Sequence, residues 1–255
     1  PEVYLIGRPS FNIEEMRRFL HRNDLSGNML HSATGTDAEK LIEMSTRLCY
    51  LSFAKGRPSP EFHQNIIDSH HGSTMEHSNW TLLIAGVSRS WSHEMVRHRA
   101  GFGFSQLSQR YVDESQCAFV MPPAVQKLGS LNQDLWIAHM VTCLDAYRQL
   151  TGELELSLHR EGLDKTTRRK RAREAARSVL PNATETMISI TGNARAWRHF
   201  IEMRSDISAD MEMRWVAIAV YERLIPEAPY IFAEYQTEIV DDGGAPVLQT
   251  PNRKV

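Results

Sequence analysis

Cysteine is scarce in this chain, which has only three among 255 residues: Cys49, Cys117 and Cys143. They lie far apart and are odd in number, whereas a disulfide framework or a zinc site needs paired or clustered cysteines. We therefore expect reduced, structural thiols rather than a disulfide scaffold or a zinc centre.

Long apolar runs and a large net charge are lacking too. No apolar segment reaches the roughly 18 residues that a membrane-spanning helix requires, and no signal-peptide pattern is visible. The formal net charge of −2 gives the chain no global attraction to nucleic acid or to an anionic membrane. These features predict a cytoplasmic protein in which any recognition of phosphate is local.

The pattern of apolar residues, helix caps and turns predicts an α+β fold. It is a single mixed α/β domain with a central sheet and long flanking helices over residues 1–240, followed by a C-terminal turn and flexible tail over residues 241–255. Strands are predicted at 3–7, 80–87, 189–191 and 230–240, and helices at 13–22, 36–50, 60–72, 90–99, 131–159, 193–204 and 208–224. The helix at 131–159 should have one apolar side formed by Leu135, His139, Val141, Leu144 and Tyr147.

Positive charge is concentrated in Arg97-His98-Arg99 and in the segment Ser105–Tyr111 that follows. Adjacent like charges repel and resist burial, so packing does not explain such a cluster. Arginine presents a planar fork of donors that matches phosphate oxygens, which favours a local site for a phosphate-bearing ligand.

Histidines near this cluster invite a metal-site interpretation, which the spacing excludes. A zinc-peptidase helix carries its histidines four residues apart, whereas His93 and His98 are five apart and point roughly 140° away from each other on a helix. We expect no metal there. Glu76 and His77 stand at the entry of an apolar strand, where a charged pair needs a partner, so we favour a functional role for His77.

Two further segments are rich in arginine. In the run at 168–177, the absence of interleaved aromatic residues favours a solvated face over a nucleic-acid site, except that Arg177 adjoins an apolar segment and could point toward a site. In the segment 193–204, Asn193 caps a helix whose N-terminal N–H groups suit an anion, and Arg195, Arg198 and His199 follow within two turns.

Taken together, these segments resemble the flavin-dependent thymidylate synthases. The family signature is Arg-His-Arg, a short spacer, then Ser and Arg-Tyr, which here is RHRAGFGFSQLSQRY over residues 97–111. The segments TRLCY (46–50), GSTMEH (72–77), ARSVLP (176–181) and TGNARAWRHFIEMR (191–204) match in order. The resemblance covers about residues 37–235.

The resemblance implies a homotetramer with shared active sites, FAD bound in each, and NADPH and 5,10-methylenetetrahydrofolate as co-substrates. The flavin-binding residues would be His77, Arg97, His98, Arg99, Asn193, Arg195 and His199. The residues around the uracil nucleotide would be Glu94, Gln106, Ser108, Arg110, Arg177 and Arg204, of which Arg204 would bind the uracil carbonyl edge and act in catalysis together with His77. No metal is implied.

The chemistry agrees with these roles. A cation at the uracil carbonyl edge stabilises the negative charge that develops when C6 accepts a nucleophile. Reduced flavin delivers hydride, so no cysteine nucleophile is needed. Ser108 has no evident His–carboxylate partner to activate it and is better suited to donating to phosphate.

Three departures from the family pattern bear on the substrate. The spacer in the signature is one residue longer than usual. We expect a π-bulge to absorb the extra residue, with Gly101 and Gly103 easing the distortion. Such a bulge would enlarge the nucleotide pocket. Glu94 replaces a frequent glutamine, and Ser208 replaces a usual histidine. The substrate therefore stays open between dUMP and UMP. A nucleic-acid-binding module using residues 168–177 and a catalytically inactive flavoprotein are the alternatives.

Overall fold

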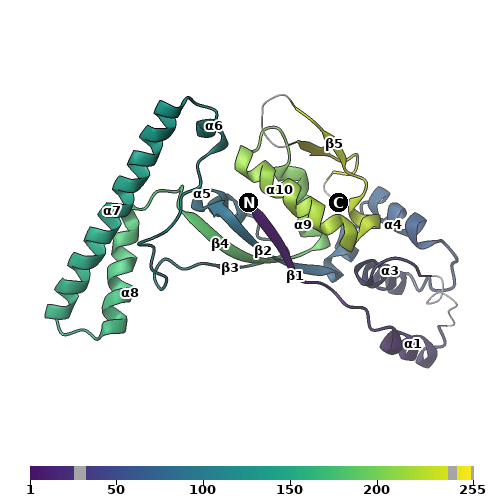
Figure 1. Cartoon of the computed structure of the whole chain (residues 1–255). Helices are drawn as coiled ribbons and strands as arrows, with labels where there is room; N and C mark the ends of the chain where they lie inside the picture. Colours follow the sequence, from purple (N-terminus) through teal and green to yellow (C-terminus); the bar gives the residue numbers. More distant parts are fainter. Residues whose placement is uncertain (26–32, 241–245, 254–255) are drawn as a thin grey trace. The chain divides into compact units, whose positions relative to one another are not determined.

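The computed structural model describes residues 1–25, 33–240 and 246–253 (Figure 1). Its elements are β1 (Glu2–Gly7), α1 (Ile13–Arg22), α3 (Asp37–Cys49), α4 (Ser59–Asp68), the 3₁₀ helix η1 (Gly72–His77), β2 (Asn79–Ser88), α5 (Arg89–Met95), β3 (Phe102–Gln106), α6 (Pro123–Gln126), α7 (Ser130–Arg160), α8 (Lys165–Ala176), η2 (Arg177–Val179), β4 (Glu185–Asn193), α9 (Ala194–Arg204), α10 (Met211–Leu224), η3 (Ile225–Glu227), α11 (Pro229–Phe232), β5 (Gln236–Glu238) and β6 (Val247–Gln249). Four strands form one sheet in the order β1-β2-β4-β3, and β5 pairs with β6. The predicted α+β fold is confirmed.

The chain divides into two compact units. The first comprises Pro1–Ile84, His98–Phe104 and Ser189–Val255, and the second comprises Ala85–Arg97 and Ser105–Ile188. Three of the four divisions fall inside the strands β2, β3 and β4, and the fourth falls between Arg97 and His98. A single catalytic domain over residues 1–240 stays a prediction.

The core of the first unit is built from aromatic and branched side chains of the sheet and of α9, α10 and α11. Trp80 of β2 is fully buried and meets the ring of Phe232 edge-on at 5.9 Å between centroids. Trp197 and Phe200 of α9 are fully buried and meet each other in the same edge-on manner at 5.9 Å. Burying such rings contributes on the order of 2–3 kcal/mol each and fixes α9 against the sheet.

The start of α3 shows how local sequence fixes a helix end. The Thr36 hydroxyl accepts from the Glu39 N–H at 3.3 Å, and the Glu39 carboxylate accepts from the Thr36 N–H at 2.8 Å, which is the capping box that the sequence predicts. The second Glu39 oxygen accepts from the N–H of Tyr230 at 2.6 Å. A local cap therefore also ties α3 to α11.

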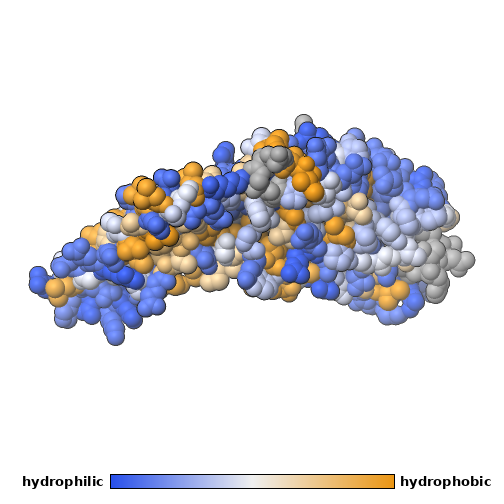
Figure 2. All heavy atoms as spheres, turned by 45° about the horizontal axis from the view of Figure 1, so that its top comes forward, coloured by the Kyte–Doolittle hydropathy of each residue, from blue (hydrophilic) through white to orange (hydrophobic). Residues whose placement is uncertain are grey.

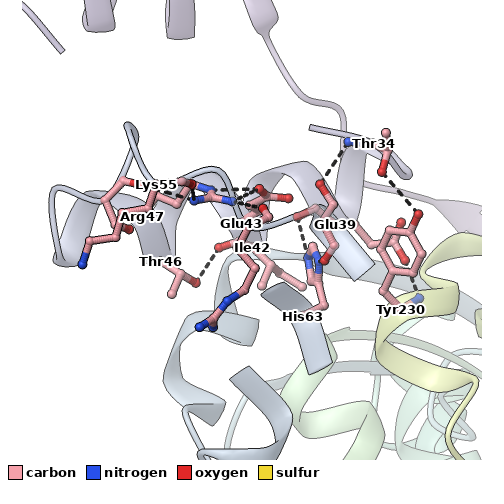
Figure 3. A network of polar contacts seen from close by, with 12 residues as sticks. Thr34, Glu39, Ile42, Glu43, Thr46, Arg47, Lys55, His63 and Tyr230 are labelled. Carbon is pink, nitrogen blue, oxygen red and sulfur yellow. Dashed lines mark hydrogen bonds and ion pairs between the residues drawn. The ribbon is translucent and has the colours of Figure 1, made fainter. Parts of the chain in front are cut away.

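A buried ion pair shapes the loop after α3 (Figure 3). Arg47 and Glu43 lie 2.7 Å apart and are almost completely buried. The Arg47 guanidinium also donates to the carbonyls of Ser52, Lys55 and Arg57 at 3.2, 3.1 and 3.0 Å. One side chain thus fixes the path of the backbone from 52 to 57.

In the second unit, α7 and α8 lie side by side (Figure 1). The long helix is confirmed, but the apolar side predicted for it is only partly covered within the chain. Tyr147 is the one buried residue of α7, whose residues are all described, while Leu135 is 57% and Val141 50% exposed. Figure 2 shows apolar residues among polar ones over this part of the chain, at the left of the view. None of the described helices combines the length and apolarity needed to span a membrane.

Several predicted boundaries are wrong. The helix predicted at 90–99 begins at Arg89 after the cap Ser88 and ends at Met95, so the Arg-His-Arg motif lies in a turn. The strand predicted at 230–240 is the helix α11 followed by the short β5, because Pro229 suits a first helical turn. Residues 247–249 of the predicted flexible tail form the paired strand β6, and the turn predicted at 241–244 lies outside the described residues.

Other elements differ in extent. The strand predicted at 189–191 is the nine-residue β4, and the helix predicted at 208–224 begins at Met211 after the cap Asp210. The helix predicted at 60–72 ends at Asp68, and η1 follows it.

Candidate functional site

The turn after the Arg-His-Arg motif docks against the N-terminus of α9 in the first unit. The Asn193 side chain caps α9 by accepting from the Ala196 N–H at 2.8 Å, and the Asn193 N–H donates to the Gly101 carbonyl at 3.2 Å. Gly101 has a φ of +77°, and a Cβ there would lie 2.6 Å from Asn193 Nδ2 and 2.9 Å from Ala196 Cβ. Only glycine fits this close approach without displacing the cap.

A cavity of about 520 Å³ opens at this junction. Its lining comprises Glu76, Ala100, Gly101, Asn193, Arg195, Ala196, His199 and Met203. Three residues predicted to bind the cofactor, Asn193, Arg195 and His199, are therefore brought together. The volume lies within the range of cofactor and ligand pockets, and the N-terminus of the eleven-residue α9 supplies N–H groups and a dipole suited to an anion.

An ion pair stands at the edge of this cavity. Arg195 Nη1 lies 2.8 Å from Glu76 Oε1, and both side chains are about half exposed. Glu76 and His77 are exposed at the end of η1, so the burial argument made for them from the sequence is wrong. The exposed position of His77 leaves it accessible to a ligand.

His98 contacts the residue predicted to bind the uracil edge. Arg204 Nε donates to His98 Nε2 at 2.8 Å, and the half-buried imidazole meets the rings of Phe200 and His199 at 5.6 and 5.7 Å. Burial, then the charge of Arg204, then His199 lower the pKa of His98 to about 4. His98 is therefore neutral near pH 7, with Nε2 as acceptor and the proton on Nδ1.

The Arg-His-Arg motif is divided between the units. Arg97 belongs to the second unit and is exposed, whereas Arg99 belongs to the first and is exposed as well. His98 is not among the residues that line the 520 Å³ cavity. Within the first unit it contacts Arg204 and the rings of His199 and Phe200, and its predicted contact with the flavin nucleotide stays a prediction.

The predicted phosphate-binding residues lie in the second unit. Gln106 Nε2 donates to the hydroxyls of Ser92 and Thr186 at 2.8 and 3.2 Å, which fixes the end of β3. In the turn that follows, the Arg110 N–H donates to the Ser108 hydroxyl at 3.4 Å. The Arg110 guanidinium is paired with Glu174 of α8 at 2.9 Å, so it would have to leave this partner to reach a phosphate.

Arg89 is a candidate for the phosphate-binding region that the sequence interpretation missed. Burial lowers the pKa of Arg89, the nearby Glu114 raises it, and Arg177 lowers it further, so the two cations are close enough to repel. Burial raises the pKa of Glu114, whose Oε1 has no hydrogen-bond partner among the described residues. Arg89 is the first residue of α5, where a cation opposes the helix dipole, but the helix predicted at 90–99 left this residue outside.

The structure describes the positions of all three departures from the family pattern. The predicted π-bulge is wrong, because Phe102–Gln106 is the strand β3 and the spacer contains the left-handed turn at Gly101. Ser208 is exposed and donates to Asp206 Oδ1 at 2.6 Å, ahead of α10. Glu94 is half-buried on α5, in the second unit.

Comparison with known proteins gives a consistent result. The family model described as thymidylate synthase complementing protein matches residues 30–230. A flavin-dependent thymidylate synthase of Mycobacterium sp. (strain KMS) is 45% identical over 227 residues, 85% of this chain and 88% of that protein. The enzyme of the same name from Mycobacterium tuberculosis (strain ATCC 25177 / H37Ra) is 42% identical over 219 residues, 82% of this chain and 85% of that protein. The crystal structure of thymidylate synthase X from Helicobacter pylori with FAD and dUMP has a TM-score of 0.59 at 20% identity, covering 91% of this chain and 97% of that one, a likeness of fold.

Proposed function

Because the chain belongs to the flavin-dependent thymidylate synthase family, we propose that it methylates C5 of a uracil nucleotide. The nucleotide is dUMP, UMP or both, the carbon comes from 5,10-methylenetetrahydrofolate, and FAD with NADPH supplies the reduction. The observation that carries this proposal beyond the family is the contact between neutral His98 and Arg204, the last residue of α9.

The residues of the 520 Å³ cavity fit a flavin nucleotide. The Asn193-capped N-terminus of α9 and the guanidinium of Arg195 suit its phosphates, and Gly101 lets the turn approach Asn193 without displacing the cap. His199 on the second turn of α9 and the exposed His77 complete the proposed contacts. When bound, reduced flavin supplies hydride.

Arg204 and His98 act as a pair in this proposal. Arg204 offers a permanent cation to the uracil carbonyl edge, where negative charge develops during attack at C6. The neutral imidazole of His98 accepts from Nε of Arg204 and so orients the guanidinium without competing for the substrate. A protonated His98 would repel Arg204 and lose this acceptor.

The substrate phosphate is assigned to the cations of the second unit. Arg177 is one of these cations, as the family resemblance implies, and an anion beside it would relieve its repulsion with Arg89. Ser108, Gln106 and Arg110 complete the phosphate contacts. The oligomer is proposed to be a homotetramer with shared active sites, as the family resemblance implies.

The test is tritium release from [5-³H]dUMP and [5-³H]UMP, with FAD, NADPH and methylenetetrahydrofolate supplied. We expect release from at least one nucleotide and bleaching of the flavin absorbance by NADPH. Arg204→Gln should bind FAD normally but release at least about 100-fold less tritium, since one transition-state contact is worth about 3 kcal/mol. No release from either nucleotide would refute the proposal and leave an inactive flavoprotein.

The half-buried Glu94 bears on the choice of sugar. A carboxylate repels phosphate but accepts a hydrogen bond from a ribose hydroxyl, so UMP remains part of the proposal. Turnover of dUMP alone would refute the proposed hydrogen bond from a ribose hydroxyl to Glu94. Glu94→Gln is the matched variant, because it removes the charge and keeps the shape.

The structure does not favour a nucleic-acid site on the run at 168–177. Arg173 is buried, donates to the Tyr111 carbonyl at 2.7 Å and pairs with Asp113 at 3.0 Å. Arg169 and Arg171 are exposed, as expected for a solvated face. The charges of α8 are therefore divided between structural contacts and solvent.

A further inference from the structure

The segment 247–253, which we call the strap, contacts α9 and has no role in the sites described above. It begins with β6, whose Val247 and Leu248 are buried. The strap belongs to the first unit, as do α9 and His98. It is therefore a candidate for holding the helix that ends in Arg204.

The first anchor of the strap is the carboxylate of Glu234. It accepts from Thr250 Oγ1 at 2.9 Å and from Asn252 Nδ2 at 2.8 Å. Glu234 also pairs with Arg198 of α9, whose side chain is 1% exposed. Arg198 Nη2 lies 3.5 Å from the Asn252 carbonyl. Because a buried guanidinium needs partners for its donors, the strap stabilises the position of this cation on α9.

The second anchor holds the last turn of α9. Arg253 Nε lies 3.1 Å from Glu202 Oε1, and the Glu202 side chain is only 7% exposed. The buried Ser205 caps the helix end: its hydroxyl donates to the Ile201 carbonyl at 2.7 Å and lies 3.3 Å from the Leu248 carbonyl of β6. The last turn of a helix frays unless its polar groups find such partners.

These contacts share one face of the helix. Arg198, Glu202 and Ser205 are spaced by four and three residues, which places them on the same side of α9. The residues of α9 that line the 520 Å³ cavity follow a different face. Arg204 is the last residue of α9, so its backbone is fixed only as well as this last turn is fixed. A displacement of about 1 Å in a reacting constellation costs about 100-fold in rate.

We propose that the strap is a positioning element for the methylation: by holding the last turn of α9, it keeps Arg204 at His98 and directed to the uracil nucleotide. If the chain methylates uracil nucleotides as proposed above, Thr250, Asn252 and Arg253 are positioning residues of that reaction. They act through Arg198, Glu202 and the backbone of α9, and not by contact with the nucleotide.

The test is the double variant Thr250→Val/Asn252→Leu in the full-length protein. It removes both side-chain donors of the strap from Glu234, changes no charge and leaves the Glu234–Arg198 pair in place. The matched control is Asn23→Leu/Thr34→Val, which makes the same two replacements at exposed positions of the first unit. There the side chains contact the Phe19 carbonyl and the Tyr230 hydroxyl.

The first readout is the pKa of His98, measured by histidine NMR with its signal identified by its loss in His98→Gln. In the wild type, burial and then the charge of Arg204 lower the pKa of His98 to about 4. In the double variant this pKa should rise by at least about 0.5, because Arg204 moves away, and in the control it should not change. An unchanged pKa of His98 in the double variant would overturn the positioning role.

The second readout is kcat in the tritium-release assay. The double variant should lower kcat at least about tenfold with an unchanged FAD content, whereas the control should match the wild type. An unchanged kcat, even with a loss of unfolding free energy, would leave the strap merely structural and overturn its role in the reaction. If the wild type releases no tritium, the proposed methylation fails, while the rise in the pKa of His98 still supports the strap as the element that holds Arg204.

A second pair of variants repeats the kinetic comparison if the double variant does not fold. Arg253→Ala removes a side chain that is 62% exposed from Glu202, and Arg8→Ala removes one that is 65% exposed from Glu227. Both pairs lie in the first unit, and only that of Arg253 involves α9. Only Arg253→Ala should lower kcat, and equal rates in the two variants would overturn the positioning role.

Discussion

Replacing His98 with glutamine should remove an acid-sensitive element from the first unit. In the folded chain the pKa of His98 is lowered from its usual 6.5 to about 4 by burial, Arg204 and His199. The unfolded chain therefore binds a proton between these two values while the folded chain does not. Stability is present above the unfolded pKa and is lost as the pH falls from about 6.5 toward 4.

The size of this loss follows from the shift. One pKa unit corresponds to about 1.4 kcal/mol, so lowering the pH from about 7.5 to about 5 should remove about 2 kcal/mol of unfolding free energy. Because His98 is only partly buried, solvent screening reduces this to about 1 kcal/mol. In His98→Gln the amide oxygen still accepts from Arg204 but does not titrate.

The assay is urea unfolding of the wild type and of His98→Gln at both pH values. We expect the wild type to lose about 1 kcal/mol more than the variant on acidification. His21→Gln is the control, since His21 is exposed on α1 and its replacement should leave the wild-type difference in place. Equal acid losses in wild type and His98→Gln would refute the assigned neutral state of His98.

Three further substitutions test the region of the cavity and the start of α3. Glu76→Gln frees Arg195 from an ion pair that is worth at most about 1 kcal/mol at this exposure. Fluorescence titration should therefore show FAD binding up to about fivefold tighter. Weaker binding would mean that Glu76 positions Arg195. Gly101→Ala forces a Cβ to 2.6 Å from Asn193 Nδ2. This variant should lower the unfolding free energy by about 1–3 kcal/mol and should also lower the FAD content. The control is Gly103→Ala, whose Cβ meets nothing within 4 Å and which should preserve both quantities. Thr36→Ala removes the capping hydroxyl of α3 and should lower the unfolding free energy by about 1 kcal/mol in urea without changing the FAD content; unchanged stability would show that the cap is dispensable.

Features written in neighbouring residues were predictable. The capping box at Thr36, the Asn193 cap and the extent of α9 depend on residues within one or two helical turns, and the structure confirms each of them. The family was also predictable, because its motifs are contiguous strings of residues. The wrong predictions lie where the local signal was weak. The segment 230–240, for example, contains β-favouring residues and was therefore predicted as one strand.

The sequence by itself therefore determined the family, the α+β class and the arginine-rich segments that serve as candidates for binding phosphate. Only the tertiary structure decided which side chains meet. Arg204 lies 106 positions along the chain from His98, and Arg195 lies 119 positions from Glu76. A pairing over such a separation depends on how helices and strands pack, and so do the burial and the neighbouring charges that set the pKa of His98. The sequence specified the chemical groups, and packing specified their partners and their protonation.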